Sequence, residues 1–397
     1  MVVFFVFHKL NHSQFIPIFA NTMKTEVPIN KDMILWAIAR AGHDLHEFLL
    51  SFPNINKWID GDKKPTVKQL EKFSNKVHIP FGYLFLQSPP DEKLPIPFFR
   101  TENNGNEKVS LNVYDTILLM QSRQEWLKSY LLENGFDTHS FVGKFDLNSD
   151  YKDIVSDIRA VLHLNEDWAR GFQTWEKALA HLTNTVEESG IILSFNSIVG
   201  NNTHRPISVD ECRGFVLVDD VAPFMFVNTA DGKAAQMFTI VHELAHIWTG
   251  QSAGFDFRKL QAANEPIEQL CDKVAAEFLV PEIAFIKEWN SNPDIKHIAR
   301  LFKVSPIVIA RRALDLKKIT KPVFFSFYSN YINQYRFKKS TQSGGGDFYA
   351  TAKKRISLTF AAHVNHAVKT NKLLYRDAAR LVGLKGDTYN QFITKHL

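Results

Sequence analysis

The chain has 397 residues, which is too long for one small core, so we expect two or three domains. Hydrophobic residues make up 45% and charged residues 22%, values that exclude a disordered or fibrous chain. The net charge of +5 is unevenly spread, because residues 321–397 hold 13 Lys and Arg against three acids, which leaves −5 for the first 320 residues.

The amino-terminal part predicts a leader followed by a small helical module. We interpret residues 1–28 as a leader of unassigned role, because the first positive charge, Lys9, follows the apolar run, whereas in a signal peptide it precedes that run. Between residues 29 and 98, apolar positions recur at helical spacing, with Gly42 as a break and Thr66 as a helix cap. Four prolines then predict a linker: Pro89, Pro90, Pro95 and Pro97.

Residues 99–320 predict helices on either side of a small sheet. The expected helices cover residues 109–132, 154–186, 233–248 and 267–279. The expected strands cover residues 190–195, 214–218 and 224–227. This order predicts an α+β fold that is mostly helical.

Residues 321–397 form a basic helical region. Helical patterns cover residues 349–370 and 373–382, after a run of three glycines at 344–346 that predicts a flexible turn. The ten surplus positive charges predict contact with an anionic partner, such as DNA or an acidic protein face. A solvated helical surface is the equally weighted alternative.

The segment from Val241 to His246 carries the pattern V-H-E-L-A-H within an expected helix. Because a helix turns once per about 3.6 residues, His242 and His246 share one face and can bind a single metal ion. Glu243 points across that site and can take a proton from metal-bound water. A strand pair that ends at Asn228 precedes this helix, as in zinc peptidases that hold substrate along a sheet edge.

A second helix supplies acids to the same site. Glu268 and Asp272 are four residues apart, so Glu268 can be the third ligand while Asp272 accepts a hydrogen bond from a ligand histidine. The fourth position stays open to water, as in catalytic zinc sites. Glu265, just before Pro266, and Glu277, off the axial line of Glu268, are weaker candidates for the third ligand.

The alternative is that these are ordinary helix histidines and a solvated acid. An isolated histidine would favour that alternative, whereas the combined spacing of ligands, base and supporting acid favours a metal site. The sequence therefore predicts a Zn²⁺ peptidase with His242, His246 and Glu268 as ligands, Glu243 as catalytic base and Asp272 as the supporting acid.

These segments resemble the ImmA/IrrE family of metallo-endopeptidases. The resemblance lies in H-E-L-A-H, in E-x-x-C-D-x-x-A-A-E-F-L-V-P and in the strand with Val227 and Asn228. It extends to S-G-G-G-D-F-Y-A-T and L-L-Y-R-D-A near the end, while P-T-V-K-Q-L-E-K, I-P-F-G-Y-L-F-L and L-P-I-P-F-F-R-T resemble an Xre-type helix-turn-helix. The resemblance implies a gluzincin-like zinc site with the same ligands and base, and cleavage of a regulatory protein, often a helix-turn-helix repressor. Asp272 stands where family members frequently have Asn.

The amino-terminal module departs from the usual Xre pattern. Between Gly42 and Trp58 it is shorter by roughly one helical turn, and the loss falls in the recognition helix. That helix, residues 54–59, offers few groups to base edges, so we expect the module to bind protein and not to select a DNA sequence. A second helix-turn-helix pattern runs through residues 298–312, where two helices that close the peptidase core are the favoured alternative.

Two functions remain open at this point. The first is a zinc endopeptidase that cleaves a regulatory protein, and the intact Glu243 favours it because a structural site needs no base beside its ligand. The second is a DNA-associated transcriptional regulator or antitoxin-like factor that uses the zinc fold for sensing, which the basic carboxy-terminal region favours. Two cysteines are too few for a disulfide framework and no apolar run approaches the ~20 residues of a membrane span, so we predict a cytoplasmic protein without membrane contact.

Overall fold

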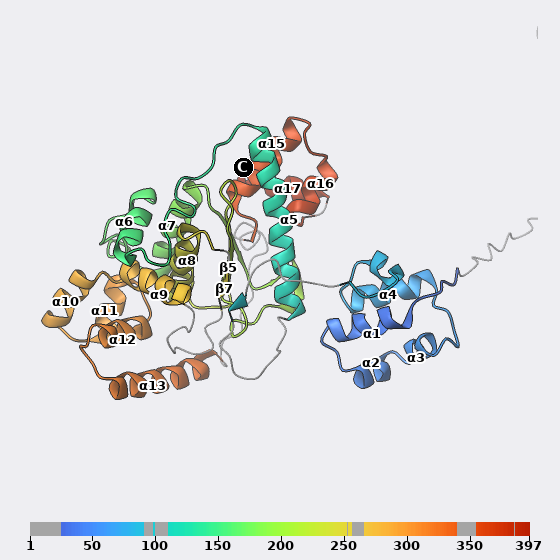
Figure 1. Ribbon diagram of the computed structural model, residues 1–397, viewed down its shortest axis with the longest axis horizontal. Coiled ribbons are helices and arrows are strands. Elements are labelled where there is room, and N and C mark those ends of the chain that lie inside the picture. Colours follow the sequence, from blue (N-terminus) through green and yellow to red (C-terminus); the bar gives the residue numbers. More distant parts are fainter. Residues whose placement is uncertain are drawn as a thin grey trace, which may run out of the picture. The chain divides into compact units, whose positions relative to one another are not determined.

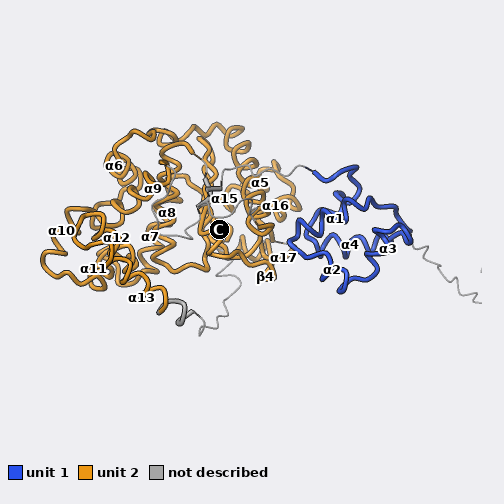
Figure 2. Tube along the Cα trace, turned by 60° about the horizontal axis from the view of Figure 1, so that its bottom comes forward, with its two compact units in different colours: residues 1–92 blue, residues 93–397 orange. Residues whose placement is uncertain are grey.

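The computed structural model describes residues 25–90, 98–99, 110–251, 253–255, 266–339, 355–384 and 386–397. The chain forms two compact units, residues 1–92 and residues 93–397 (Figure 2). The described residues are mostly helical, with a small mixed sheet in the second unit (Figure 1). The predicted α+β class is therefore confirmed.

The first unit consists of short helices around a core of its own. Its elements are α1 (Lys31–Arg40), α2 (Leu45–Ser51), α3 (Asn54–Ile59), α4 (Val67–Lys76) and the 3-10 helix η1 (Phe81–Phe85). Thr66 and Gln69 form a capping box at the start of α4, where the sequence predicted an N-cap. In the core, the ring of Phe73 meets those of Phe48 and Trp58 edge-on.

Helix α3 is short, with bounds equal to those predicted from the sequence. Ile55 and Trp58 are buried in the core of the first unit. Asn54, Asn56 and Lys57 are exposed, so only these three polar side chains of α3 are available to a partner.

Several predictions fall outside the described residues. These are the leader up to residue 24, the linker prolines Pro95 and Pro97, the turn at 344–346 and Glu265. Residues 25–28, assigned to the leader, belong to the first unit, because Glu26 forms a β-bridge with Thr66.

The sheet of the second unit has the strand order β1-β7-β5-β6-β2. Its strands are β1 (Phe98–Phe99), β2 (Ile192–Asn196), β5 (Gly214–Leu217), β6 (Phe224–Asn228) and β7 (Ala253–Phe255). Strand β6 pairs antiparallel with β5 and parallel with β2, and β7 adds to the other side of β5. Every residue of β2, β5 and β6 is buried, which agrees with their nearly continuous apolar sequences. A separate hairpin joins β3 (Ile198–Val199) to β4 (Asn202–Pro206).

One face of the sheet packs against the helices that carry the predicted site. They are α6 (Tyr151–Val161), α7 (Trp175–Glu188), α8 (Lys233–Trp248), α9 (Pro266–Leu279), α10 (Glu282–Ser291), α11 (Ile295–Phe302) and α12 (Pro306–Asp315). Val216 and Met225 of the sheet share a core with Leu244 of α8 and Val274 of α9. The bounds predicted for α8 and α9 agree with the structure to within one residue.

The prediction of one helix over residues 154–186 is wrong, since the chain forms α6 and α7 with a break between them. His163 takes a left-handed conformation with φ of 53° just after α6, which a continuing helix cannot contain. Thr174 then caps α7 by accepting a hydrogen bond from the backbone N–H of Lys177.

The opposite face of the sheet packs against a second helical layer. This layer comprises α5 (Leu111–Glu133), α15 (Leu358–Lys369), α16 (Tyr375–Val382) and α17 (Asp387–His396), seen on the far side of the sheet from α7 and α8 in Figure 1. Phe215 and Phe226 of the sheet join Ile117 of α5 and Phe360 of α15 in one core. Residues 355–397, part of the predicted basic region, are therefore part of the second unit.

Helices α11 and α12 coincide with the second helix-turn-helix pattern of the sequence. Ile298, Phe302 and Ile309 are buried in the core that also contains α8 and α9. The pair therefore closes that core, which the sequence favoured over a second helix-turn-helix. Helix α13 (Lys321–Lys339) follows α12. Among the described residues, none of the helices combines the length and apolar character that a bilayer span needs.

Candidate metal centre

Helix α8 brings its two histidines together one turn apart. His242 and His246 have no exposed surface, and their ring centroids lie 5.1 Å apart. Nearly every residue in the last three turns of α8 is buried, so both rings are enclosed between α8, α9 and the sheet. Both imidazoles therefore face one small region of the protein interior.

Glu268 of α9 faces both imidazoles. Its Oε2 lies 3.1 Å from Nε2 of His242, and its Oε1 lies 3.2 Å from Nε2 of His246. Two ligands that hold a tetrahedral ion at about 2.0–2.1 Å are about 3.3 Å from each other. Glu268 thus presents one carboxylate oxygen to each imidazole at about the separation of two zinc ligands.

Asp272 holds the outer edge of the His242 ring. Its Oδ1 lies 3.1 Å from Nδ1 of His242, so Nδ1–H can donate to the carboxylate, and Nε2, which faces Glu268, is the ring nitrogen that would bind a metal ion. Burial lowers the pKa of His242, but hydrogen bonds and charges from Asp272 and Glu268 outweigh burial and raise it to about 10. Burial likewise opposes ionisation of Glu268, but its hydrogen bond with His242 and the nearby imidazoles of both histidines hold its pKa well below the usual range. The site therefore favours a positive charge between these groups, which a cation can supply.

Several buried polar atoms of the site have no hydrogen-bond partner among the described residues. Both carboxylate oxygens of Glu243 and both ring nitrogens of His246 lack a hydrogen-bond partner among the described residues, although neither side chain has exposed surface. Burial, and then the charge of Glu268, raise the pKa of Glu243 to about 8 against the opposing effect of His242. A buried polar group without a partner costs about 1–3 kcal/mol. These residues therefore fit a bound divalent metal ion with water beside it.

Gly214 allows the sheet to approach α8 at this point. A Cβ atom on Gly214 would lie 2.4 Å from Cγ2 of Thr239 and 2.8 Å from the carbonyl oxygen of Phe226, and 3.5 Å from Oε1 of Glu243. Only glycine leaves room for strand β5 to pass this close to the base residue. This role of Gly214 could not be predicted from the sequence, because it depends on a packing distance between distant segments.

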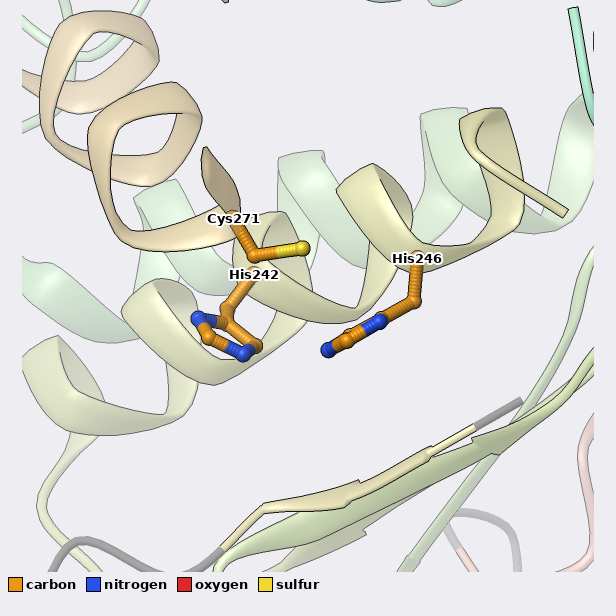
Figure 3. A group of neighbouring side chains, drawn as sticks. All are labelled: His242, His246 and Cys271. Carbon is orange, nitrogen blue, oxygen red and sulfur yellow. The ribbon is translucent and has the colours of Figure 1, made fainter. Parts of the chain in front are cut away.

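Cys271 is a further metal-binding candidate that the sequence analysis did not propose. Its Sγ and one nitrogen each of His242 and His246 lie within 4.8 Å of one another (Figure 3). Burial, with the charges of Glu268 and Glu243 added, raises the pKa of the Cys271 thiol well above its usual value. The signal that could have identified it is its position three residues after Glu268 on the same helix.

The weaker third-ligand candidates are not brought to the site. Glu277 forms an ion pair with Arg312 and accepts a hydrogen bond from the backbone N–H of Glu282, so its carboxylate is committed to α10 and α12. Glu265 lies outside the described residues. Among the described acids, Glu268 is the one that faces both imidazoles.

Comparison with known families agrees with this geometry. Residues 187–314 match the family model of the IrrE N-terminal-like domain, Peptidase_M78. The match runs from the end of α7 to the end of α12, so this part of the chain is a metallopeptidase-type domain whose H-x-x-x-H pair forms a zinc-peptidase-like site. The resemblance to the ImmA/IrrE family is thereby confirmed for this segment.

A second match lies at residues 356–395, to a domain of unknown function, DUF8813. The chain matches no curated protein. Neither matched segment includes residues 29–98, so the Xre-type helix-turn-helix stays a prediction.

Proposed function

We propose that the protein is a zinc-dependent endopeptidase that hydrolyses a peptide bond in a regulatory protein. The observation that carries this proposal is the buried carboxylate of Glu243, which has no described partner and lies beside two histidines that face Glu268 at ligand spacing. A purely structural metal site has no use for such a group. The family match of residues 187–314 supports the same activity.

Each residue then has a distinct part in the reaction. His242, His246 and Glu268 would hold the ion, while Asp272 fixes the orientation of the His242 ring. Bound zinc supplies a Lewis acid that polarises the peptide carbonyl and makes water more acidic. Glu243 accepts the proton of the attacking water at its carboxylate and returns it to the leaving amine.

The substrate class, a regulatory protein and often a helix-turn-helix repressor, comes from the resemblance to the ImmA/IrrE family. A docking role for the first unit is consistent with its surface, because Leu45, Leu50 and Phe52 on and after α2 are 40%, 70% and 38% exposed. The adjacent α3 offers only Asn54, Asn56 and Lys57 as exposed polar groups, too few for reading base edges.

The test is co-expression of the full chain with the helix-turn-helix proteins of its own genome, followed by mass spectrometry of the fragments. We expect one of these proteins to be cut by the wild type and left intact by Glu243→Gln, with zinc still bound to the variant. Glu188→Gln, an exposed change at the end of α7, is the matched control and should cleave normally. Equal cleavage by Glu243→Gln and wild type would contradict the proposed role of the base.

The second candidate function is a DNA-associated regulator. The observation that favours it is the surplus of ten positive charges after residue 320, of which Arg376 and Arg380 on α16 are exposed. This role is compatible with peptidase activity in the same chain.

A further inference from the structure

Cys271 occupies an unusual position beside the candidate metal centre. It is fully buried on α9, three residues after Glu268, and points from α9 toward the two imidazoles of α8 (Figure 3). Its sulfur and the two histidine nitrogens are mutually within 4.8 Å. The histidines therefore face two different donors from the same helix, a carboxylate and a thiol.

A second observation independently points to a ligand in this space. Both ring nitrogens of His246 and both oxygens of Glu243 have no hydrogen-bond partner among the described residues, while both side chains are fully buried. Buried polar atoms are nearly always paired, so a bound group belongs among them. The thiol of Cys271 lies at the edge of that same space.

The distances allow the sulfur to become a ligand after a small adjustment. Zinc binds sulfur at about 2.3 Å and imidazole nitrogen at about 2.0–2.1 Å, so tetrahedral S···N separations are about 3.5 Å. The three donor atoms lie within 4.8 Å of one another, so they need to draw together by about 1.5 Å at most. Glu268 needs no such movement, because its oxygens already lie 3.1 and 3.2 Å from the nitrogens.

We propose that Cys271 is a switchable fourth protein ligand, whose thiolate closes the coordination position that the hydrolytic water would occupy. This inference rests on the proposed zinc site. In the step, the S–H bond of Cys271 and the bond between zinc and water break, a zinc–sulfur bond forms, and the proton passes to solvent with no change in oxidation state. The site then has an open state with two histidines and Glu268, and a closed, inactive state in which Cys271 is added.

The other cysteine of the chain provides a matched control. Cys212 is also fully buried, but its Sγ donates a weak hydrogen bond to the carbonyl oxygen of Gly214, 3.7 Å away, and it belongs to the core on the opposite face of the sheet. The sequence contains two cysteines, so Cys212 and Cys271 account for every thiol.

The experiment is X-ray absorption of zinc in the purified full chain, together with ultraviolet absorption after replacement of zinc by Co²⁺. In purified wild type and Cys212→Ala, we expect molecules in the closed state to contribute sulfur scattering near 2.3 Å and a thiolate-to-cobalt charge-transfer band. For Cys271→Ala, we expect zinc to stay bound with nitrogen and oxygen neighbours only, and the band to disappear. Cys271→Ser serves as a second variant of closer size if the alanine variant does not fold.

The possible results distinguish a failure of the ligand role of Cys271 from a failure of the zinc site itself. Bound zinc without sulfur scattering in the wild type overturns the role of Cys271 and leaves the proposed zinc site standing. Sulfur scattering that survives in both Cys271 variants overturns it as well. A wild-type chain that binds no zinc overturns the metal site itself, and the ligand role of Cys271 with it.

Discussion

Replacement of Glu243 by Gln is expected to stabilise the metal-free protein at neutral pH. The wild-type carboxyl has a pKa of about 8 in the fold against an ordinary value of 4.5, chiefly because of burial. Above pH 4.5, folding requires this group to stay protonated or to ionise without a partner, whereas in the unfolded chain it ionises freely. Gln has nearly the same shape and does not titrate.

The size of this stabilisation follows from the linkage between proton binding and folding. Because the folded pKa is raised, stability is highest below pH 4.5 and falls by about 1.4 kcal/mol per pH unit as the pH rises toward 8. At pH 7 the loss is about 3 kcal/mol, which the Gln variant avoids. The gain of the variant over the wild type should therefore be absent near pH 4.5 and grow to a plateau above pH 8.

Urea unfolding of chelator-treated protein at several pH values between 4.5 and 9 measures this gain. Glu188→Gln, with its exposed side chain, should show no such pH dependence. Excess zinc should reduce the difference between the wild type and Glu243→Gln, because a cation beside Glu243 favours its ionised carboxylate and therefore stabilises the wild type more than the variant. A difference between the two metal-free proteins that does not change with pH would refute the reasoning.

Three further changes test other parts of the structure. His246→Ala should lose the stoichiometric zinc, and full occupancy by elemental analysis would exclude it as a ligand. Gly214→Ala should destabilise the fold by about 1–3 kcal/mol in urea unfolding, because its Cβ would lie 2.4 Å from Cγ2 of Thr239. If the basic region contacts DNA, retention of the full chain on DNA should fall steeply with salt, and Arg376→Gln or Arg380→Gln should each lower the slope of that dependence by about one. Retention unaffected by salt would argue against phosphate contacts.

Local pattern was sufficient for much of the fold and for choosing candidate site residues that the structure brings together. The helix that carries His242 is a largely apolar segment between Gly232 and Gly250, so its bounds could be predicted from sequence. The buried strands β5 and β6 are apolar runs between turns. The spacing of one turn along α9 predicted that Glu268 and Asp272 share a face, and the structure places both beside His242.

The missed features depend on contacts between segments far apart in the chain. Strands β1, β7 and β3 have two or three residues each, which is too short for an alternating pattern, and they form because a partner strand lies beside them. The place of Cys271 depends on how α9 packs against α8, which spacing along one helix does not determine. The break after α6 depends on His163, a residue other than glycine in the left-handed conformation, which sequence alone seldom indicates.

The two-sided sheet has a practical consequence for work with shortened forms of this chain. Its strands alternate between two cores, so Phe224 and Phe226 face the layer that contains Phe360, while Met225 between them faces α8. A protein cut after Ile319 would keep α5 on that face but lose α15, α16 and α17, including the ring of Phe360 that packs edge-on against Phe224. Loss of activity or of DNA retention in such a fragment would therefore combine the loss of this packing with the loss of the carboxy-terminal charges, and those charges are better tested by single substitutions in the intact chain.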